Sequence, residues 1–486
     1  MQAAPETLLL MTMLVPALAV PCIIAVGRYE NVREAVSITA GLILIYLVTS
    51  LYSILKSGGS IALASPDLFP GLALKFEIEP LGMIFSLVAS SLWLVTTVYA
   101  IGYMRGHNEK NQTRFYACFA IAISSSMAIA FADSLFTLFI FYEVLTLSTY
   151  PLVTHAGTEK AKFGGRVYLG VLLTTSILFL LFAILGTWYS AGTVDFVPGG
   201  VFTPETSPVT SGALLVLFIF GIGKAAIMPF HRWLPAAMVA PTPVSALLHA
   251  VAVVKAGVFT VLKVSVYIFG LDLLATLPTT DVMLYLAAAT VLLASIVAMR
   301  QDNLKARLAY STVSQLGYIT TGALLATSAG IIGGAMHIAM HAFGKITLFF
   351  CAGAIMVAAH KTEISQMRGI GRRMPFTMTA FFIGALSIIG LPPTGGTWGK
   401  WYLMIGAFDA EKWTIMAVLM LSSLLNIAYL LPIPLQSFFS GEEEQGSVKI
   451  QEAPLPSLVA LLFTAVGCII LFFFPQPLYE LASAIL

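Results

Sequence analysis

The chain has 486 residues, of which 58% are hydrophobic and only 10% are charged, and its formal net charge is +2. The mean hydropathy of +0.92 excludes a soluble globular protein. So small a net charge gives no reason to expect a nucleic-acid partner.

Long apolar runs separated by short polar loops predict an all-α polytopic membrane protein. In lipid only helices and closed barrels satisfy every backbone polar group, and the weak alternation that is typical of a barrel is absent. We predict about fourteen transmembrane helices, with ends near residues 7–27, 35–55, 80–104, 115–131, 134–153, 167–189, 211–239, 244–269, 282–299, 308–326, 330–357, 376–406, 413–437 and 455–474.

The basic residues of the loops are distributed unequally between the two sides of these spans. With the N-terminus outside, the outside loops hold only Lys56, Lys75 and Lys412. The inside loops hold Arg28, Arg33, Arg105, Lys110, Arg114, Lys160, Lys162, Arg166, Arg300, Lys305, Arg307, Lys361, Arg368, Arg372, Arg373 and Lys449. This asymmetry supports the number of spans, and it predicts a multi-pass protein of the cell (inner or cytoplasmic) membrane with its N-terminus outside.

Signals for cofactors, metals and processing are missing from the sequence. The first apolar segment has no basic region and no cleavage site, so we expect a retained helix rather than a signal peptide. The four cysteines, Cys22, Cys118, Cys351 and Cys468, form no Cys-x-x-Cys pair, which argues against iron–sulfur ligation and disulfides. No glycine-rich nucleotide loop stands out. We therefore expect neither a cofactor nor a metal on this chain.

Two of the predicted spans contain helix-breaking residues near mid-membrane depth. The breakers are Pro229 and Pro235 in span 211–239, and Pro392, Pro393, Gly395 and Gly396 in span 376–406. Breaks at corresponding positions of two halves are a sequence sign of an inverted-repeat transporter. The alternative is that prolines kink these helices harmlessly. We favour functional breaks because each one adjoins an intramembrane lysine.

The two breaks are five spans apart, as two inverted five-helix repeats would place them. We therefore predict N-terminal helices 1–3 over residues 1–110 and a first repeat, helices 4–8, over residues 111–270. A second repeat, helices 9–13, would occupy residues 281–437, and a C-terminal loop with helix 14 would occupy residues 438–486. Helices 7 and 12 are the broken ones. The polar segment 57–79 fits a small extended hairpin outside the membrane.

Four lysines and one glutamate lie deep within the predicted spans: Lys224, Lys255, Lys345, Lys400 and Glu143. A lysine at the centre of a membrane helix costs roughly 2.5–3.5 kcal/mol to insert, so such residues indicate function by default. A lysine holds its proton more tightly beside a carboxylate than away from it, so a Glu–Lys pair that separates can drive proton transfer. The alternative is a static buried ion pair that fixes helix packing.

Histidines supply intermediate groups for a proton path. His249 lies six residues before Lys255, and His337, His341 and Lys345 share one helix face by their i, i+4, i+8 spacing. We interpret them as parts of a hydrated proton path, with a polar packing role as the alternative. Zinc is disfavoured because the next residue on that face is the cation Lys345.

Two further basic residues are left open. Lys263 lies two turns beyond Lys255, where snorkelling toward the outer interface and a functional role are equally good interpretations. Arg232 follows Pro229 and is either structural or a support for a neighbouring functional group.

Several of these stretches resemble the antiporter-like subunits shared by complex I and Mrp-type sodium/proton antiporters. The resemblance rests on PFHRWLP from Pro229 and APTPVSALLH from Ala240, with Lys224 before and Lys255 after, and on Phe141-Tyr-Glu143. It also rests on His337-x3-His341-x3-Lys345 and on Gly396-Thr-Trp-Gly-Lys400, and it covers roughly residues 75–475.

Within this family the sequence is most similar to the D-type subunit of Mrp antiporters. Lys400 occupies a position where one complex I relative has glutamate, and no long lateral helix follows helix 14. Close relatives in membrane-bound hydrogenases are similar as well. Ala236 and Ala237 stand where many relatives have an acidic residue, so any role of that acid is missing.

The resemblance implies fourteen helices, two inverted repeats and a hydrated axis of charged residues at mid-membrane. It implies that Glu143 and Lys224 are the coupling pair and that Lys255 is the central relay. Lys345 with His341 would bridge to Lys400, the terminal exchange site.

The leading functional hypothesis is a proton-translocating subunit of a multisubunit monovalent cation (sodium)/proton antiporter, with other membrane subunits as partners. The alternative is the proton-pumping, antiporter-like subunit of a redox complex, such as a complex I-like NADH:quinone oxidoreductase or a membrane-bound hydrogenase. A stand-alone solute transporter fits less well, because the intramembrane charges form a series rather than one cluster.

Overall fold

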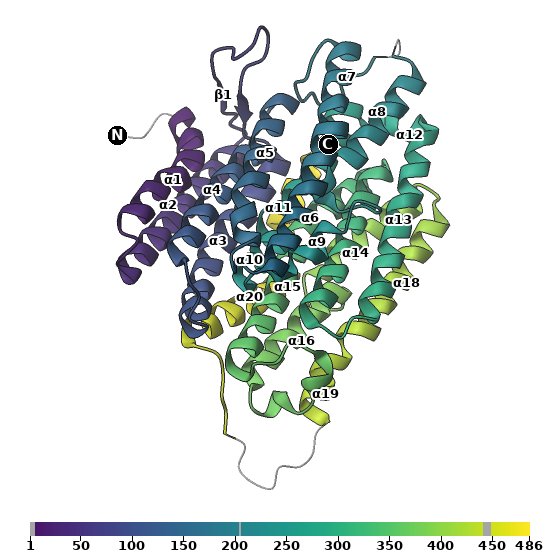
Figure 1. Cartoon of the computed structure of the whole chain (residues 1–486). Coiled ribbons are helices and arrows are strands. Elements are labelled where there is room, and N and C mark those ends of the chain that lie inside the picture. The colour runs from purple at the N-terminus through teal and green to yellow at the C-terminus, as the bar shows by residue number, and fades with distance from the viewer. Residues whose placement is uncertain (1–4, 204–205, 441–448) are drawn as a thin grey trace.

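The structure is a computed structural model that describes residues 5–203, 206–440 and 449–486. Parts of three predicted segments lie outside these residues, namely positions 1–4 of the N-terminal segment 1–110, 204–205 of the first repeat 111–270, and 441–448 of the C-terminal segment 438–486. The described chain forms one elongated bundle of helices, with a small hairpin at one end and α19 at the other (Figure 1).

The N-terminal edge of the bundle consists of α1 (Pro5–Ala25), α2 (Glu30–Lys56) and α3 (Pro80–Gly106). Between α2 and α3, strands β1 (Ala62–Ala64) and β2 (Lys75–Glu77) pair antiparallel, with Ala62 opposite Glu77. The extended hairpin predicted at 57–79 is therefore confirmed. We call its end of the molecule the hairpin end.

The next part of the chain carries the first break. It contains α4 (Gln112–Ala130), α5 (Leu135–Val153), α6 (Glu159–Thr175), the π turn η1 (Ser176–Leu180), α7 (Leu181–Ala191), α8 (Pro208–Gly221), the 3-10 turn η2 (Gly223–Ala225), α9 (Trp233–Ala236) and the 3-10 turn η3 (Ala237–Val239). It continues with α10 (Thr242–Ala246), the π turn η4 (Leu247–Val251), α11 (Val253–Val264) and the π turn η5 (Ser265–Phe269). The run 242–269 is buried throughout, at the centre of the molecule.

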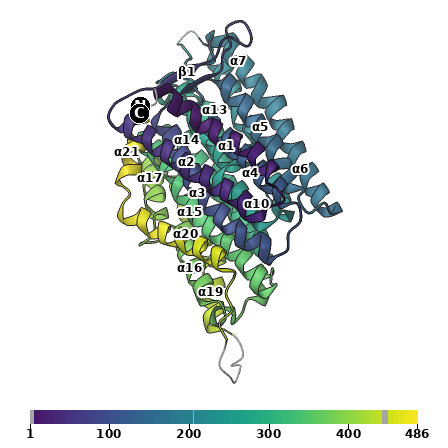
Figure 2. The ribbon, with the colours of Figure 1, turned by 90° about the vertical axis from the view of Figure 1, so that its left-hand side faces the viewer.

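The remaining helices surround the long central helix α15 (Ser328–Ala359). They are α12 (Leu271–Thr276), α13 (Pro278–Met299), α14 (Leu304–Leu324), α16 (Pro375–Ile389), α17 (Gly396–Asp409), α18 (Trp413–Leu430), α19 (Pro432–Phe439), α20 (Leu455–Phe473) and α21 (Gln476–Ser483), with short 3-10 turns η6 (Ile364–Gln366) and η7 (Ile370–Arg372). Helix α15 packs against α3, α14, α16, α17 and α20, and Figure 2 shows α20 alongside α3. The short helix α21 was not predicted.

The all-α polytopic fold is confirmed. Within the described residues, eleven helices are long and apolar enough to cross a membrane. The other three predicted spans are the two broken ones and α14, whose buried side chains include Ser311, Thr312, Ser314 and Gln315 and lower its hydropathy. Hydroxyl and amide caps begin several helices: the side chains of Ser134, Thr158, Asn303 and Thr327 each accept a backbone N–H of the first turn.

Both predicted helix breaks are present. The first helix stops at Gly221 and the chain resumes helical structure at Trp233, while the second stops at Ile389 and resumes at Gly396. Buried partners satisfy backbone groups that the breaks free from the helical ladder: the Trp233 indole donates to Gly223 O at 2.9 Å, and Gly395 N donates to Cys468 O at 2.8 Å. The irregular backbone is thus held by protein contacts, as membrane depth requires.

Candidate functional site

The predicted proton-transfer side chains lie inside the bundle. Lys224, Lys255 and Lys345 are fully buried, and Lys400 is 7% exposed. The three histidines His249, His337 and His341 are buried as well. These seven residues come from η2, η4, α11, α15 and α17, and we call them the buried axis. Contacts of α11 with η2 and of α15 with both α11 and α17 bring the segments together.

Lys224 lies in the 3-10 turn η2, directly after α8 ends. Its Nζ donates to the backbone oxygen of Tyr142 at 2.8 Å and to Thr146 Oγ1 at 2.6 Å, and it lies 3.1 Å from the centre of the Tyr142 ring. Its backbone N–H donates to the Tyr142 hydroxyl at 3.1 Å. The break therefore directs this lysine onto α5, one residue away from Glu143.

Glu143 forms no ion pair with Lys224 in the structure. Both carboxylate oxygens of Glu143 are buried and have no hydrogen-bond partner among the described residues. The side chain is only half buried, and the neighbouring positions Ile140, Val144 and Leu147 on the same helix are exposed. A static Glu143–Lys224 ion pair is therefore not what holds α5 against η2.

Close backbone packing joins the first break to α11. A Cβ atom added at Gly257 would lie 2.3 Å from the carbonyl carbon of Lys224, so only glycine fits there. Two residues before this contact, Lys255 Nζ lies 2.5 Å from Nδ1 of His341 on α15. The structure thus brings together Lys255 and His341, which are 86 positions apart in sequence.

His249 lies within the π turn η4, one turn before α11. Its ring centre is 4.7 Å from that of Phe349, and neither ring nitrogen has a hydrogen-bond partner among the described residues. Local π turns often mark functional positions because they redirect a side chain from the regular helical face.

A hydroxyl group of α14 binds Lys345, and a hydroxyl of α18 binds that same group. Its Nζ donates to Ser311 Oγ at 2.8 Å, and the hydroxyl of Tyr429 donates to the same Ser311 oxygen at 3.1 Å. Tyr429 also hydrogen-bonds Asn426 Oδ1. A short chain of exchangeable protons therefore begins at this lysine.

The second break holds Lys400 near His337. The Lys400 Nζ donates to Ile389 O, the last carbonyl of α16, at 3.0 Å, and to Ser423 Oγ at 3.1 Å. It lies 4.6 Å from the ring centre of Tyr318, whose hydroxyl is 3.2 Å from Ser423 Oγ. A Cβ at Gly399 would come within 2.8 Å of His337 Nδ1, so α17 approaches α15 closely at this point.

Several residues of the site were not predicted from the sequence. They are the partners Tyr142, Thr146, Ser311, Gln315, Tyr318, Ser423 and Tyr429; Gln315 Oε1 lies 2.9 Å from His337 Nε2. A signal was available in the span 308–326, where hydroxyl and amide residues recur within an apolar helix. No sequence signal connects those residues to a particular lysine, because the connection depends on how the helices pack.

The structure also places the two basic residues that the sequence left open. Lys263 is 2% exposed and forms an ion pair with Glu79. Arg232 is exposed beside the first break. Pro229 precedes this arginine within the break, whereas Pro235, predicted as a breaker, lies inside the short helix α9 that follows.

All four lysines of the buried axis contact neutral groups. Their polar partners are backbone carbonyls, hydroxyls and one imidazole, and no carboxylate lies within ion-pair distance of any of them in the described parts of the chain. Burying an ammonium group without a counter-charge is costly. Each lysine can hold or give up one proton, and each lies next to a group able to donate or accept one.

No group of three or more histidine, cysteine, aspartate or glutamate side chains within the described residues could hold a metal ion. The four cysteines are free thiols.

Comparison with known proteins gives consistent matches. Residues 132–426 match the family described as NADH:quinone oxidoreductase/Mrp antiporter, TM. NADH-quinone oxidoreductase subunit N of Desulforudis audaxviator is 31% identical over 94% of this chain and 95% of its own. Other curated relatives are longer, and this chain spans about half of their length.

Two solved structures share the fold at low sequence identity. A chain of the Mrp complex from Dietzia sp. superposes with a TM-score of 0.86 at 21% identity, covering 99% of this chain and 96% of its own. A chain of the membrane-bound sulfane sulfur reductase, an archaeal respiratory membrane complex, gives 0.87 at 21% identity, covering 98% and 96%.

Proposed function

Because this chain belongs to the NADH:quinone oxidoreductase/Mrp antiporter family, we propose that it is the proton-translocating subunit of a multisubunit monovalent cation/proton antiporter, with sodium as the exchanged cation. Protons would move at mid-membrane depth along the buried axis. The fold match to a chain of an Mrp complex supports the antiporter assignment, and similarity to the D-type subunit of such antiporters is part of the proposal.

The observation that carries this proposal is the set of buried lysines with neutral partners. A purely structural lysine at this depth would be expected to have a carboxylate beside it, because an unpaired buried ammonium is destabilising. Retaining four such residues inside one bundle, with Lys255 in direct contact with His341, serves a purpose if they take part in proton transfer. The polar partners and two backbone breaks supply places where water can enter the path.

We assign roles in the order in which the axis runs. Lys224 at the first break, with Glu143 on the adjacent α5, would couple this chain to its neighbour. Lys255 and His341 in direct contact would form the central relay, with His249 nearby on the same run. Lys345 and His337 on α15 would lead to Lys400 at the second break, the terminal exchange site.

The proposed orientation in the membrane follows from the unequal distribution of basic residues between the loops on the two sides. The multi-pass character is established by the apolar helices and by the family. We propose the cell (inner or cytoplasmic) membrane, with the N-terminus and the hairpin end outside. Other membrane subunits are expected partners, since the matched structures are chains of complexes, and the half-buried Glu143 faces a side of the bundle that a neighbour could cover.

A second candidate function is the proton-pumping membrane subunit of a redox complex. The nearly full-length match to subunit N of an NADH-quinone oxidoreductase and the fold match to a respiratory sulfur reductase favour it. The proton path on this chain would be the same. The subunits that copurify with this chain discriminate between the two functions. Iron–sulfur subunits would indicate a redox complex, and small membrane subunits would indicate an antiporter.

The test of the proton path uses Lys255→Ala in the assembled complex, reconstituted in vesicles with a trapped pH dye. We expect proton flux to fall by at least a hundredfold while the complex remains assembled. The control is Lys162→Ala, which removes an exposed lysine whose partner Glu159 lies 2.8 Å away on the same helix. Wild-type flux in Lys255→Ala would refute the proposed path.

A further inference from the structure

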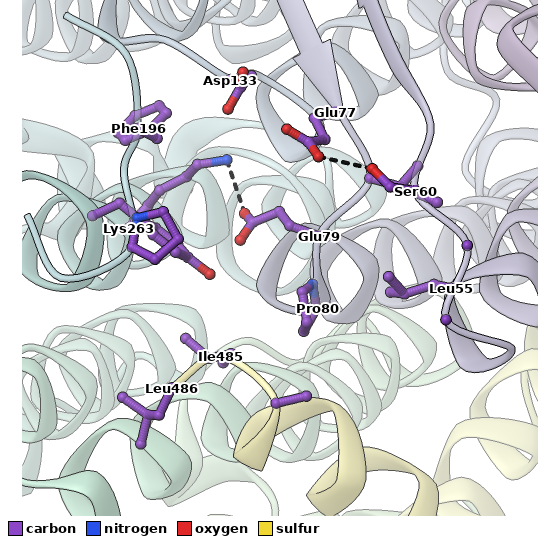
Figure 3. A pocket seen from close by; sticks show the side chains of 16 residues that line it. Leu55, Ser60, Glu77, Glu79, Pro80, Asp133, Phe196, Lys263, Ile485 and Leu486 are labelled. Atoms are coloured by element: carbon purple, nitrogen blue, oxygen red, sulfur yellow. Dashed lines mark hydrogen bonds and ion pairs between the residues drawn. The ribbon is translucent and has the colours of Figure 1, made fainter.

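A cavity of about 460 Å³ opens at the hairpin end of the bundle. It lies between β2 with the start of α3, the link between α4 and α5, the loop that follows α7, the end of α11 with η5, and the last residues of the chain. Figure 3 shows Lys263 and Glu79 directed toward each other in it, with Glu77 and Asp133 close by.

The ion pair at this cavity lies between the bundle interior and the opening. Lys263 Nζ is 2.8 Å from Glu79 Oε1, donates to the backbone oxygen of Ala132 at 2.5 Å, and lies 4.6 Å from the ring centre of Phe196. Glu79 is 15% exposed, and its carboxylate also interacts with the side chain of Tyr267, which lines the same cavity.

Further carboxylates give the cavity an excess of negative charge. The pKa of Asp133 is raised to about 6, mainly by burial; the Lys263 charge lowers it, and the carboxylates of Glu77, Asp195 and Glu79 contribute to the rise. Glu77 accepts a hydrogen bond from the hydroxyl of Ser60 at 2.9 Å.

One helix connects this cavity to the buried axis. Lys255 and Lys263 both belong to α11, whose residues are all buried, and they are separated by about 12 Å along the helix axis. Phe259 lies between them in sequence, and its ring centre is 5.6 Å from Lys263 Nζ. The same element thus carries a lysine of the axis and a lysine at the edge of an open cavity.

We propose that this cavity is the aqueous mouth of the proton path at the hairpin end, and that the Lys263–Glu79 pair exchanges protons between Lys255 and bulk water. Starting from the ion pair, Lys263 passes its proton to Glu79, and Glu79 releases that proton to water in the cavity. Lys263, now a neutral amine, then takes a proton from the side of Lys255, which restores the ion pair. The inference rests on the proposed function.

The first experiment separates proton exchange from charge and packing. Lys263→Arg keeps a cation beside Glu79, but a guanidinium does not release its proton in proteins. We expect at least a tenfold loss of proton flux in the reconstituted complex, with unchanged assembly and melting temperature. Lys412→Arg is the matched control, because Lys412 also pairs with a carboxylate, Asp281, at 2.7 Å. Wild-type flux in Lys263→Arg would overturn the proposal.

The second experiment asks whether the cavity is the route. Leu55→Cys places a thiol in its wall, in a Cys22→Ser, Cys118→Ala background, and a bulky membrane-impermeant cationic thiol reagent is added from the hairpin side. We expect the modification to block flux. Ser57→Cys, which is exposed nearby but does not line the cavity, should react without loss of flux. Full flux after complete modification of Leu55→Cys would contradict the assignment.

The outcomes distinguish this inference from the proposed function. If Lys255→Ala abolishes flux while Lys263→Arg and modified Leu55→Cys transport normally, the axis is correct and the mouth lies elsewhere. If Lys255→Ala transports normally, the proposed function itself fails.

Discussion

Two groups of cations in this molecule differ in their partners. Near the start of α2, Arg105 Nη2 lies 2.5 Å from Glu34 Oε2, and Arg33, which is 3% exposed, lies 3.7 Å from the other oxygen of Glu34. The four lysines of the buried axis contact carbonyls, hydroxyls and one imidazole instead.

The two groups differ in whether a carboxylate lies beside the cations. We call Arg33, Arg105 and Glu34 the arginine corner. There the Glu34 carboxylate compensates the cations, and Gln112 Oε1 accepts a further hydrogen bond from Arg33 at 2.8 Å, as expected of a structural contact between helices. The buried axis has no such neutralisation, although this chain can supply acids elsewhere. This contrast supports the proposed role of the unpaired lysines in proton transfer over a role in packing.

The largest effect that would test this contrast is expected from removing the ionisable residues at the proposed start of the buried axis. We expect Lys224→Ala or Glu143→Ala to reduce cation-driven proton flux by at least a hundredfold, because each removes an ionisable group from the path. Assembly should persist, since the structure contains no Glu143–Lys224 ion pair whose loss would leave a charge unpaired. Vesicle flux and native gels of the purified complex measure the two effects, and loss of assembly would instead indicate a structural role.

A second test separates charge from proton exchange at Lys400. Lys400→Arg keeps the positive charge and should assemble, but we expect at least a tenfold loss of flux, because arginine does not give up its proton. Lys400→Glu can still titrate and should retain partial flux. If Lys400→Arg transports at the wild-type rate, Lys400 is a fixed electrostatic element and the exit is elsewhere.

The smallest effect on transport is expected at the arginine corner. Arg105→Ala leaves the buried carboxylate of Glu34 with weaker compensation, so we expect a loss of stability of about 1–2 kcal/mol, a discounted figure because Arg105 is 39% exposed. Flux per assembled complex should be unchanged. Thermal melting and flux normalised to assembled protein check both parts, and a large fall in normalised flux would remove the contrast between the two groups.

Much of the fold could be predicted because its determinants are local. An apolar run long enough to cross a membrane forms a helix wherever it lies, and clustered breakers such as Pro392 and Pro393 indicate where it stops. Single prolines do not suffice, because Pro16, Pro21 and Pro151 lie inside continuous helices. The hairpin near residue 62 followed from a polar interruption between two such runs. The helix α21 was missed because it is a single short amphipathic segment without the signal of a membrane span.

The identity of the buried ionisable residues was likewise evident from the sequence, since a lysine inside an apolar run stands out. Their partners could not be predicted, because such contacts join distant parts of the chain. Lys255 and His341 are 86 positions apart, and the Lys263–Glu79 pair joins α11 to the residue before α3. The absence of a Glu143–Lys224 contact had the same origin. Hydropathy and proline positions fix each helix separately, whereas the rotation and packing of helices against one another fix which side chains meet.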